Sequence, residues 1–192
     1  METVEVKPKY MPLIQKPMCC NVTCTQMILL RHDIMPPLQD EIAKHVGVTI
    51  SKKDQKCFMR KLKVLKKPYG IETVTKKTEN RYNKFFKKKK LPLRVKAYRT
   101  SQIKNHIKFI IENMKKGNDI QVEVSMKKIN GKLTCHDLVL SKIVCKRTCY
   151  VTLIDPWWMN KQIHRIKLKT LIESMNKKWF DRELGFLVYY KS

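Results

Sequence analysis

The chain has 192 residues, a length that fits one domain with a core of its own. Its 42 lysines and arginines against 16 acidic residues give a net charge of +26, which attracts polyanions without specifying any of them. No stretch approaches the roughly 18 consecutive apolar residues of a membrane span, and no secretion signal opens the chain. We therefore expect no membrane span and a single domain over 1–192, located in the cytoplasm with its seven cysteines reduced.

Three helices are predicted in the first third of the chain. Apolar residues at helical spacing predict a helix over 21–31 that begins at Cys20, and a second helix over 39–46. A third helix, running through Leu65, is predicted from a capping-box pattern that starts at Ser51.

The middle of the chain gives mixed signals. Residues 66–90 are polar and rich in lysine, with a weak helical signal around 82–86. Alternating apolar residues predict a short strand over 93–98. We then predict a helix that is capped by Ser101 and ends at Gly117.

After Gly117 the period of the apolar residues changes to two, which is typical of strands. We predict a strand over 120–124 and a partner strand from Leu133, joined by a hairpin turn at Asn130-Gly131. The remaining predicted elements are strands over 149–154, 163–168 and 184–190, and a helix capped by Thr170 that buries Trp179. Helices first and strands afterwards predict an α+β fold, with N-terminal helices packed on a C-terminal antiparallel β-sheet.

Cys20 opens the first predicted helix, where a thiol can become a nucleophile. Free amide groups and the dipole at a helix N-terminus favour thiolate over thiol and lower the cysteine pKa. Gln15 lies five residues upstream, close enough to donate a hydrogen bond to the oxyanion that forms when sulfur attacks a carbonyl. The alternative is a buried cysteine that simply starts a core helix.

A cysteine nucleophile needs a base and a group that orients the base. His136 lies in a predicted apolar strand, whereas the other histidines lie on stretches that look solvated: His32, His45, His106 and His164. Asp155 ends the next strand, and antiparallel pairing would bring its carboxylate beside His136. We expect the adjacent Asp137 to point away from His136, because successive side chains of a strand project to opposite faces.

The order of these residues resembles that of the papain-like cysteine peptidases of the bacteriocin-processing, double-glycine leader type. In that family a glutamine precedes a cysteine that opens an apolar helix, a histidine lies on a later strand, and an aspartate before a proline ends the next strand. Here the matching residues are Gln15, Cys20, His136 and Asp155. The resemblance extends from about Leu13 to Tyr189.

This resemblance implies a papain-like cysteine peptidase fold, a peptide or protein substrate and no cofactor. It assigns Cys20 as the nucleophile that forms a thioester acyl-enzyme, His136 as general base and acid, and Asp155 as the group that orients His136. Gln15 and the Cys20 backbone N–H would stabilise the oxyanion. Asn21 stands where the family usually has glycine.

Three other readings of the sequence stay open. The C-x-x-x-C pairs Cys20/Cys24 and Cys145/Cys149 suggest a zinc site. The net charge and the aromatic-basic stretch 81–87 suggest a protein that binds nucleic acid or another polyanion. A papain-like module that binds peptides without cleaving them is the third.

Overall fold

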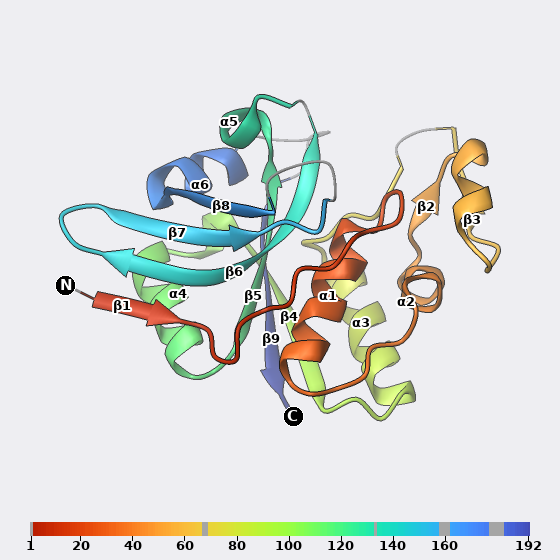
Figure 1. Cartoon of the computed structure of the whole chain (residues 1–192), viewed down its shortest axis with the longest axis horizontal. Helices are drawn as coiled ribbons and strands as arrows, with labels where there is room; N and C mark the ends of the chain where they lie inside the picture. The colour runs from red at the N-terminus through yellow and green to blue at the C-terminus, as the bar shows by residue number, and fades with distance from the viewer. Residues whose placement is uncertain (1, 67–68, 133, 158–161, 177–182) are drawn as a thin grey trace.

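The computed structural model describes residues 2–66, 69–132, 134–157, 162–176 and 183–192 (Figure 1). One large sheet lies between two groups of helices. One side carries α1 (Cys20–Arg31) and α3 (Lys76–Lys88), with α2 (Gln39–Val46) packed against both; the other side carries α4 (His106–Lys115) and α6 (Leu168–Met175), with α5 (Lys127–Asn130) beside α6.

The strands of this sheet pair antiparallel in the order β4-β9-β5-β6-β7-β8, and β1 pairs with the far end of β6. Their bounds are β1 (Glu2–Glu5), β4 (Leu93–Arg99), β5 (Asp119–Ser125), β6 (Cys135–Cys145), β7 (Cys149–Ile154), β8 (Ile163–Lys167) and β9 (Gly185–Lys191). A separate parallel pair is formed by β2 (Thr49–Ile50) and β3 (Lys63–Val64). The predicted α+β class, with early helices packed on an antiparallel sheet, is confirmed.

Elements with a strong local signal form where they were predicted. The first helix begins at Cys20, and the second ends at Gly47, whose φ of +82° is the left-handed conformation that glycine adopts without strain. The weak signal around 82–86 proves to be the centre of α3, which begins after the N-cap Thr75. Its buried aromatic face explains why α3 forms in a lysine-rich segment.

The predicted helix through Leu65 is wrong. Lys52–Cys57 forms a 3₁₀-helix, η1, and the chain then continues into β3. Ser51 Oγ donates to the Asp54 carboxylate at 2.5 Å, so these two side chains bond to each other and do not cap a longer helix. Pairing of β3 with β2 replaces the helical hydrogen bonds.

Two other helix starts were placed wrongly. Residues 100–102 form a 3₁₀ turn, η2, and α4 begins after Asn105, whose side chain accepts from the Lys108 N–H at 3.0 Å. Ser101 therefore does not cap α4. Thr170 lies inside α6, which follows β8 directly, and the predicted burial of Trp179 falls outside the described residues.

The connection between β5 and β6 also differs from the prediction. The two strands pair antiparallel, with Val124 opposite His136. Asn130-Gly131 is not a two-residue hairpin turn, because Asn130 ends the short helix α5 and Gly131 caps it at φ +80°. The predicted strand start at Leu133 lies outside the described part of the chain.

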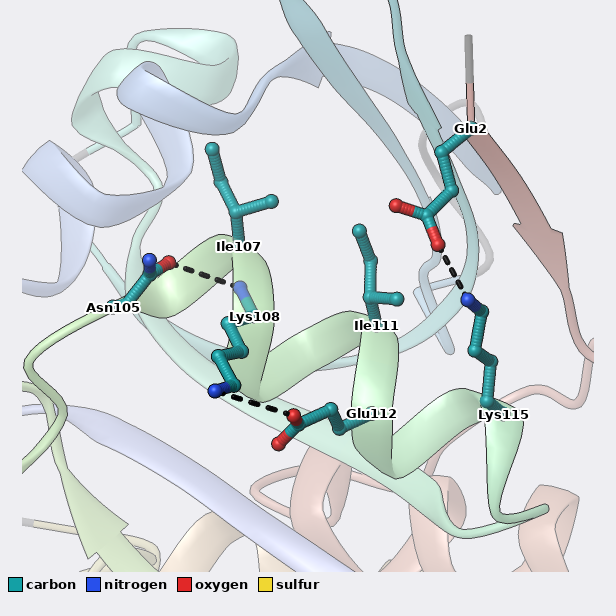
Figure 2. Close-up of a pocket in the computed structure, with 7 residues that line it drawn as sticks. All are labelled: Glu2, Asn105, Ile107, Lys108, Ile111, Glu112 and Lys115. Atoms are coloured by element: carbon teal, nitrogen blue, oxygen red, sulfur yellow. Dashed lines mark hydrogen bonds and ion pairs between the residues drawn. The ribbon is translucent and has the colours of Figure 1, made fainter.

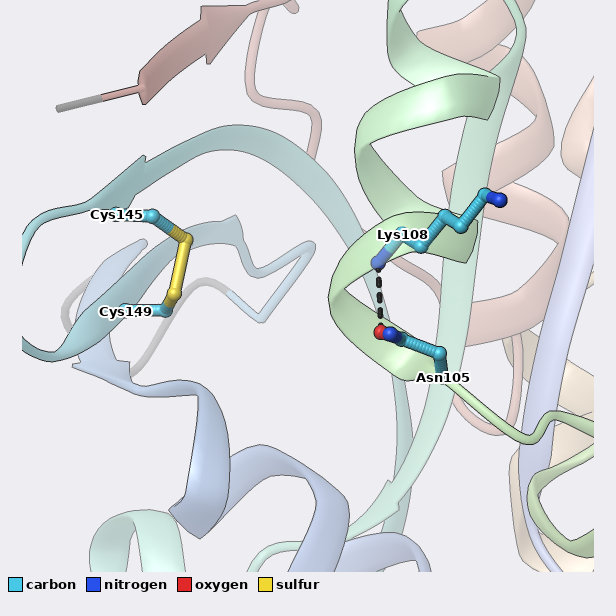
Figure 3. Close-up of a disulfide and its surroundings, with 4 residues drawn as sticks. All are labelled: Asn105, Lys108, Cys145 and Cys149. Carbon is cyan, nitrogen blue, oxygen red and sulfur yellow. Dashed lines mark hydrogen bonds between the residues drawn. A yellow bond between two sulfur atoms is a disulfide. The ribbon is translucent and has the colours of Figure 1, made fainter.

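The expectation that all cysteines are reduced is wrong for Cys145 and Cys149, which form a disulfide at the tip of the β6–β7 hairpin (Figure 3). These residues are opposite each other in the strand register, so pairing brings their Cα atoms to 4.1 Å. Disulfides are typical of oxidising compartments, and the cytoplasmic location stays an expectation. None of the helices in the described ranges is long and apolar enough to cross a membrane.

Close contact between β4 and β9 predicts that Gly185 tolerates no side chain. A Cβ at Gly185 would clash with the backbone carbonyl oxygen of Tyr98, so Gly185→Ala should lower the free energy of unfolding by about 2 kcal/mol or more. Gly131→Ala is the control: open space surrounds Gly131, and only its positive φ costs about 1 kcal/mol. Urea unfolding measures both, and equal losses would contradict the prediction.

Candidate active site

Two adjacent cysteines, Cys19 and Cys20, lie at the start of α1. Cys19 is the N-cap residue and is completely buried, and burial raises the pKa of its thiol to about 12. Cys20 is the first helical residue and is only partly buried by surface area. Of this adjacent pair, Cys20 is therefore the less buried residue.

The Cys20 thiol contacts the carboxylate of Asp137, a contact that was not predicted from the sequence. Sγ donates to Asp137 Oδ2 at 3.5 Å. The same carboxylate, almost completely buried, accepts from Thr73 Oγ1 at 3.0 Å and from Gln121 Nε2 at 2.9 Å. Three donors on its two oxygens match an ionised carboxylate, which only accepts hydrogen bonds, and they oppose the burial that raises the pKa of Asp137.

This environment opposes the activation expected at a helix N-terminus. Burial and then the negative charge of Asp137 raise the pKa of the Cys20 thiol well above its usual value. The expectation of a lowered pKa at Cys20 is thus contradicted for the conformation described, because desolvation and a nearby carboxylate outweigh the helix end. The thiol is protonated in this state and donates a hydrogen bond to Asp137.

A buried polar network continues inward from Asp137. Thr73 Oγ1 accepts a hydrogen bond from Asn21 Nδ2 at 3.1 Å. The side-chain oxygen of Asn21 accepts a hydrogen bond from the Tyr82 hydroxyl group. On the other branch, Gln121 accepts from the Tyr189 hydroxyl at 2.9 Å. Asn21, which stands where the resembled family has glycine, thus holds the first turn of α1 against α3.

His136 and Asp155 are in contact, as the strand pairing predicted. His136 Nε2 lies 2.7 Å from Asp155 Oδ1, and the backbone N–H of Trp157 donates to the same oxygen at 2.7 Å. The second oxygen of Asp155 lies 3.0 Å from His164 Nε2. The expectation that His164 and His32 are solvated is wrong, since their side chains are 11% and 7% exposed and each contacts a buried aspartate.

The Cys20 thiol and the His136 ring are not joined by a hydrogen bond in the described chain. The thiol contacts Asp137. His136 is the residue before Asp137 on β6, and successive side chains of a strand project to opposite sides. The first turn of α1 would have to move past the start of β6 for the thiol to meet His136. The structure therefore brings the segments of the predicted triad together without the Cys-His contact itself.

Gln15 lies in a loop that is fastened beside Asp155. Its backbone N–H donates to the carbonyl oxygen of Pro156 at 3.0 Å. The side chain of Gln39 bonds to the backbone on both sides of Gln15. Its oxygen accepts a hydrogen bond from the Lys16 N–H at 2.8 Å, and its nitrogen donates one to the Ile14 carbonyl oxygen at 2.9 Å. Gln15 itself is 8% exposed, and its Oε1 is buried without a partner in the described residues.

Two of the alternative readings lose part of their support. No three histidine, cysteine, aspartate or glutamate side chains gather to hold a metal ion within the described ranges, and Cys145 and Cys149 are bonded to each other. The aromatic residues of the basic stretch 81–87 are buried and cannot stack on bases: Tyr82, Phe85 and Phe86.

Comparisons with known proteins show a similarity to solved structures. No family model and no curated protein matches the chain. Among solved structures, the chain is similar to a double glycine motif protease from an AMS/PCAT transporter, crystallised in complex with the leader peptide. The match has a TM-score of 0.41 and 12% sequence identity, and it covers 98% of this chain and 99% of the other.

The contact between Cys20 and Asp137 predicts how the thiol titrates. Asp137→Asn removes a negative charge beside the sulfur, so the pKa of Cys20 should fall and its alkylation should begin at lower pH. Asp33→Asn, at the opposite end of α1, should leave the profile unchanged. Quantitative mass spectrometry of the Cys20 peptide across a pH series gives the profile, and a shift to higher pH would refute the assignment.

Asp155 predicts a pH-dependent part of the stability. Burial opposes its ionisation, but hydrogen bonds from His136, His164 and the Trp157 N–H prevail and lower its pKa from 3.8 to about 2. A carboxylate with a lowered pKa stabilises the fold above its unfolded pKa, and this contribution disappears as pH falls through the folded pKa. Asp155→Asn should therefore be less stable than the native chain near neutral pH, with the difference vanishing between about pH 4 and 2.

Urea unfolding of both proteins across this pH range measures the difference. Asp33→Asn serves again as the control, because the Asp33 side chain is exposed. A stability difference that persists unchanged at low pH would show that Asp155 acts through packing and not through its charge.

Proposed function

We propose that this chain is a thiol hydrolase of the cysteine peptidase class, acting on peptide or isopeptide bonds as a single domain over 1–192. One observation supports the proposal: three contacts join the segments that carry the four predicted residues. Gln15 bonds to the residue after Asp155, Cys20 bonds to the residue after His136, and His136 bonds to Asp155. Segments far apart in sequence thus converge on the first turn of α1.

In this mechanism the described conformation is the resting one. Because His136 projects from the other side of β6, the first turn of α1 must move past the start of that strand before the Cys20 thiol meets His136. His136 then takes the thiol proton as the sulfur attacks the substrate carbonyl carbon. The oxyanion accepts hydrogen bonds from the Gln15 amide and the Cys20 backbone N–H. His136 then gives the proton to the leaving amine, leaving a thioester that water hydrolyses.

Asp155 keeps its hydrogen bond to His136 throughout, which fixes the ring and stabilises its protonated form. His164 donates to the other carboxylate oxygen and holds Asp155 in place. The peptide substrate is part of the proposal, and it agrees with the leader peptide bound to the double glycine motif protease. Binding of nucleic acid has only the net charge behind it.

Two reagents separate a substrate-binding thiol from a merely exposed one. Iodoacetamide should label the exposed Cys57 faster than Cys20, whereas an electrophile carried on a peptide should label Cys20 selectively. Cys20→Ala should abolish that labelling and also the cleavage of a pooled library of unstructured peptides, both read by mass spectrometry. Absence of selective labelling and of cleavage would leave a module that binds peptides without cutting them.

Variants of the neighbouring residues test the roles. Asp155→Asn should lower turnover about 100-fold with the fold intact, in line with the loss of an orienting carboxylate. Asp137→Asn should retain activity, because Asp137 holds the thiol only at rest. If Asp137→Asn is inactive while His136→Gln is active, Asp137 is the base and the proposed triad is wrong.

A further inference from the structure

A hollow with a volume of about 440 Å³ lies at the opposite end of α1 from Cys20. Between Cys20 and Arg31 the helix rises roughly 16 Å, so this hollow is separate from the candidate active site. The end of α1 and the C-terminus of the chain lie together at the bottom of the view in Figure 1. Residues from several distant segments line the hollow, among them Lys7, Arg31, His32, Asp33, Lys116 and Lys191.

Three cations of this hollow have no acidic partner. The side chains of Lys7, Lys116 and Lys191 are exposed, and no carboxylate of the described residues pairs with them. They come from the loop after β1, the end of α4 and the end of β9. Holding three like charges together costs energy unless an anion joins them.

A groove on α4 shows the contrast (Figure 2). Its lysines are paired within the groove: Lys115 with Glu2 at 2.6 Å, and Lys108 with Glu112 at 3.8 Å. That groove has no surplus positive charge among its lysines. The hollow at the end of α1 has three unpaired lysines against the single carboxylate of Asp33 in its lining.

The wall behind these lysines is rigid and buried. Arg31 is 6% exposed and pairs with Asp119 at 2.9 Å, and His32 Nε2 lies 2.6 Å from the same carboxylate. The Tyr10 hydroxyl donates to Asp119 at 2.5 Å. Arg31 Nε is buried and has no hydrogen-bond partner in the described chain. The other guanidinium nitrogens of Arg31 donate to Asp119 and to the Lys7 carbonyl oxygen, so Arg31 forms a fixed floor beneath the three lysines.

We propose that this hollow binds a small phosphate-bearing molecule, with its phosphate oxygens between Lys7, Lys116 and Lys191 and against Arg31. Adjacent phosphate groups carry several charges on closely spaced oxygens, which matches cations that converge from separate segments. The volume falls in the range of small-molecule sites. Asp33 would repel a phosphate, but its carboxylate can accept from a hydroxyl group of the same ligand.

Inorganic pyrophosphate is the probe, titrated into the full chain by calorimetry at constant ionic strength. We expect saturable binding at one site, weakened about tenfold or more by Lys7→Gln/Lys116→Gln/Lys191→Gln. The matched control is Lys52→Gln/Lys53→Gln/Lys56→Gln, which removes the same charge from exposed positions on η1 and should change the affinity less than about twofold.

Three outcomes would overturn the proposal. One is the absence of saturable binding, and another is an equal loss in both triple variants, which would indicate a diffuse surface field. The third involves a short single-stranded DNA oligonucleotide added as competitor. If the oligonucleotide displaces pyrophosphate stoichiometrically, and only the variant of Lys7, Lys116 and Lys191 loses the oligonucleotide, the site belongs to nucleic acid and not to a small molecule.

Discussion

The buried carboxylate of Asp137 is the constraint on which the candidate site depends. An ionised group out of water is costly unless hydrogen bonds replace its hydration, and here the donors come from three separate elements: Cys20 on α1, Thr73 before α3 and Gln121 on β5. Each donor must be in place to keep the charge satisfied. Packing α1 on the sheet and positioning the thiol are therefore one and the same event. A slip of β6 by one residue would exchange Asp137 with His136 and leave the carboxylate on the wrong face.

Much of the fold follows from local patterns. Helix starts and ends with their own chemistry, such as Gly47 after α2, were predictable. The alternation of β5 also predicted a strand, but it did not show what the polar face of that strand contacts. That face is buried: Asp119 meets Arg31, Gln121 meets Asp137, and Glu123 accepts from the Val74 N–H. Alternation cannot distinguish solvent from polar partners that arrive from distant parts of the chain.

Part of the candidate site could likewise be predicted from local patterns, and part of it could not. Cys20 could be chosen because a helix begins there, and the contact of His136 with Asp155 follows from strand order and register. The contact of Cys20 with Asp137 could not be found in this way, since 117 residues separate them and only the packing of α1 on β6 joins them. No local sequence pattern predicts that the Gln39 side chain bonds to the backbone on both sides of Gln15. Sequence patterns selected the candidate residues and the pairing of His136 with Asp155, whereas the carboxylate beside the Cys20 thiol emerged only from tertiary packing.

Burial of every residue of β5 has a consequence for the motions of the molecule. This strand lies between β6 and β9, and each of its seven residues is shielded from water. Its backbone amides can exchange with solvent only when the whole sheet opens, so they report global unfolding and not local breathing. Because Asp119 lies under the hollow at the end of α1 and Gln121 lies under the thiol, both sites rest on the segment of the chain that opens last.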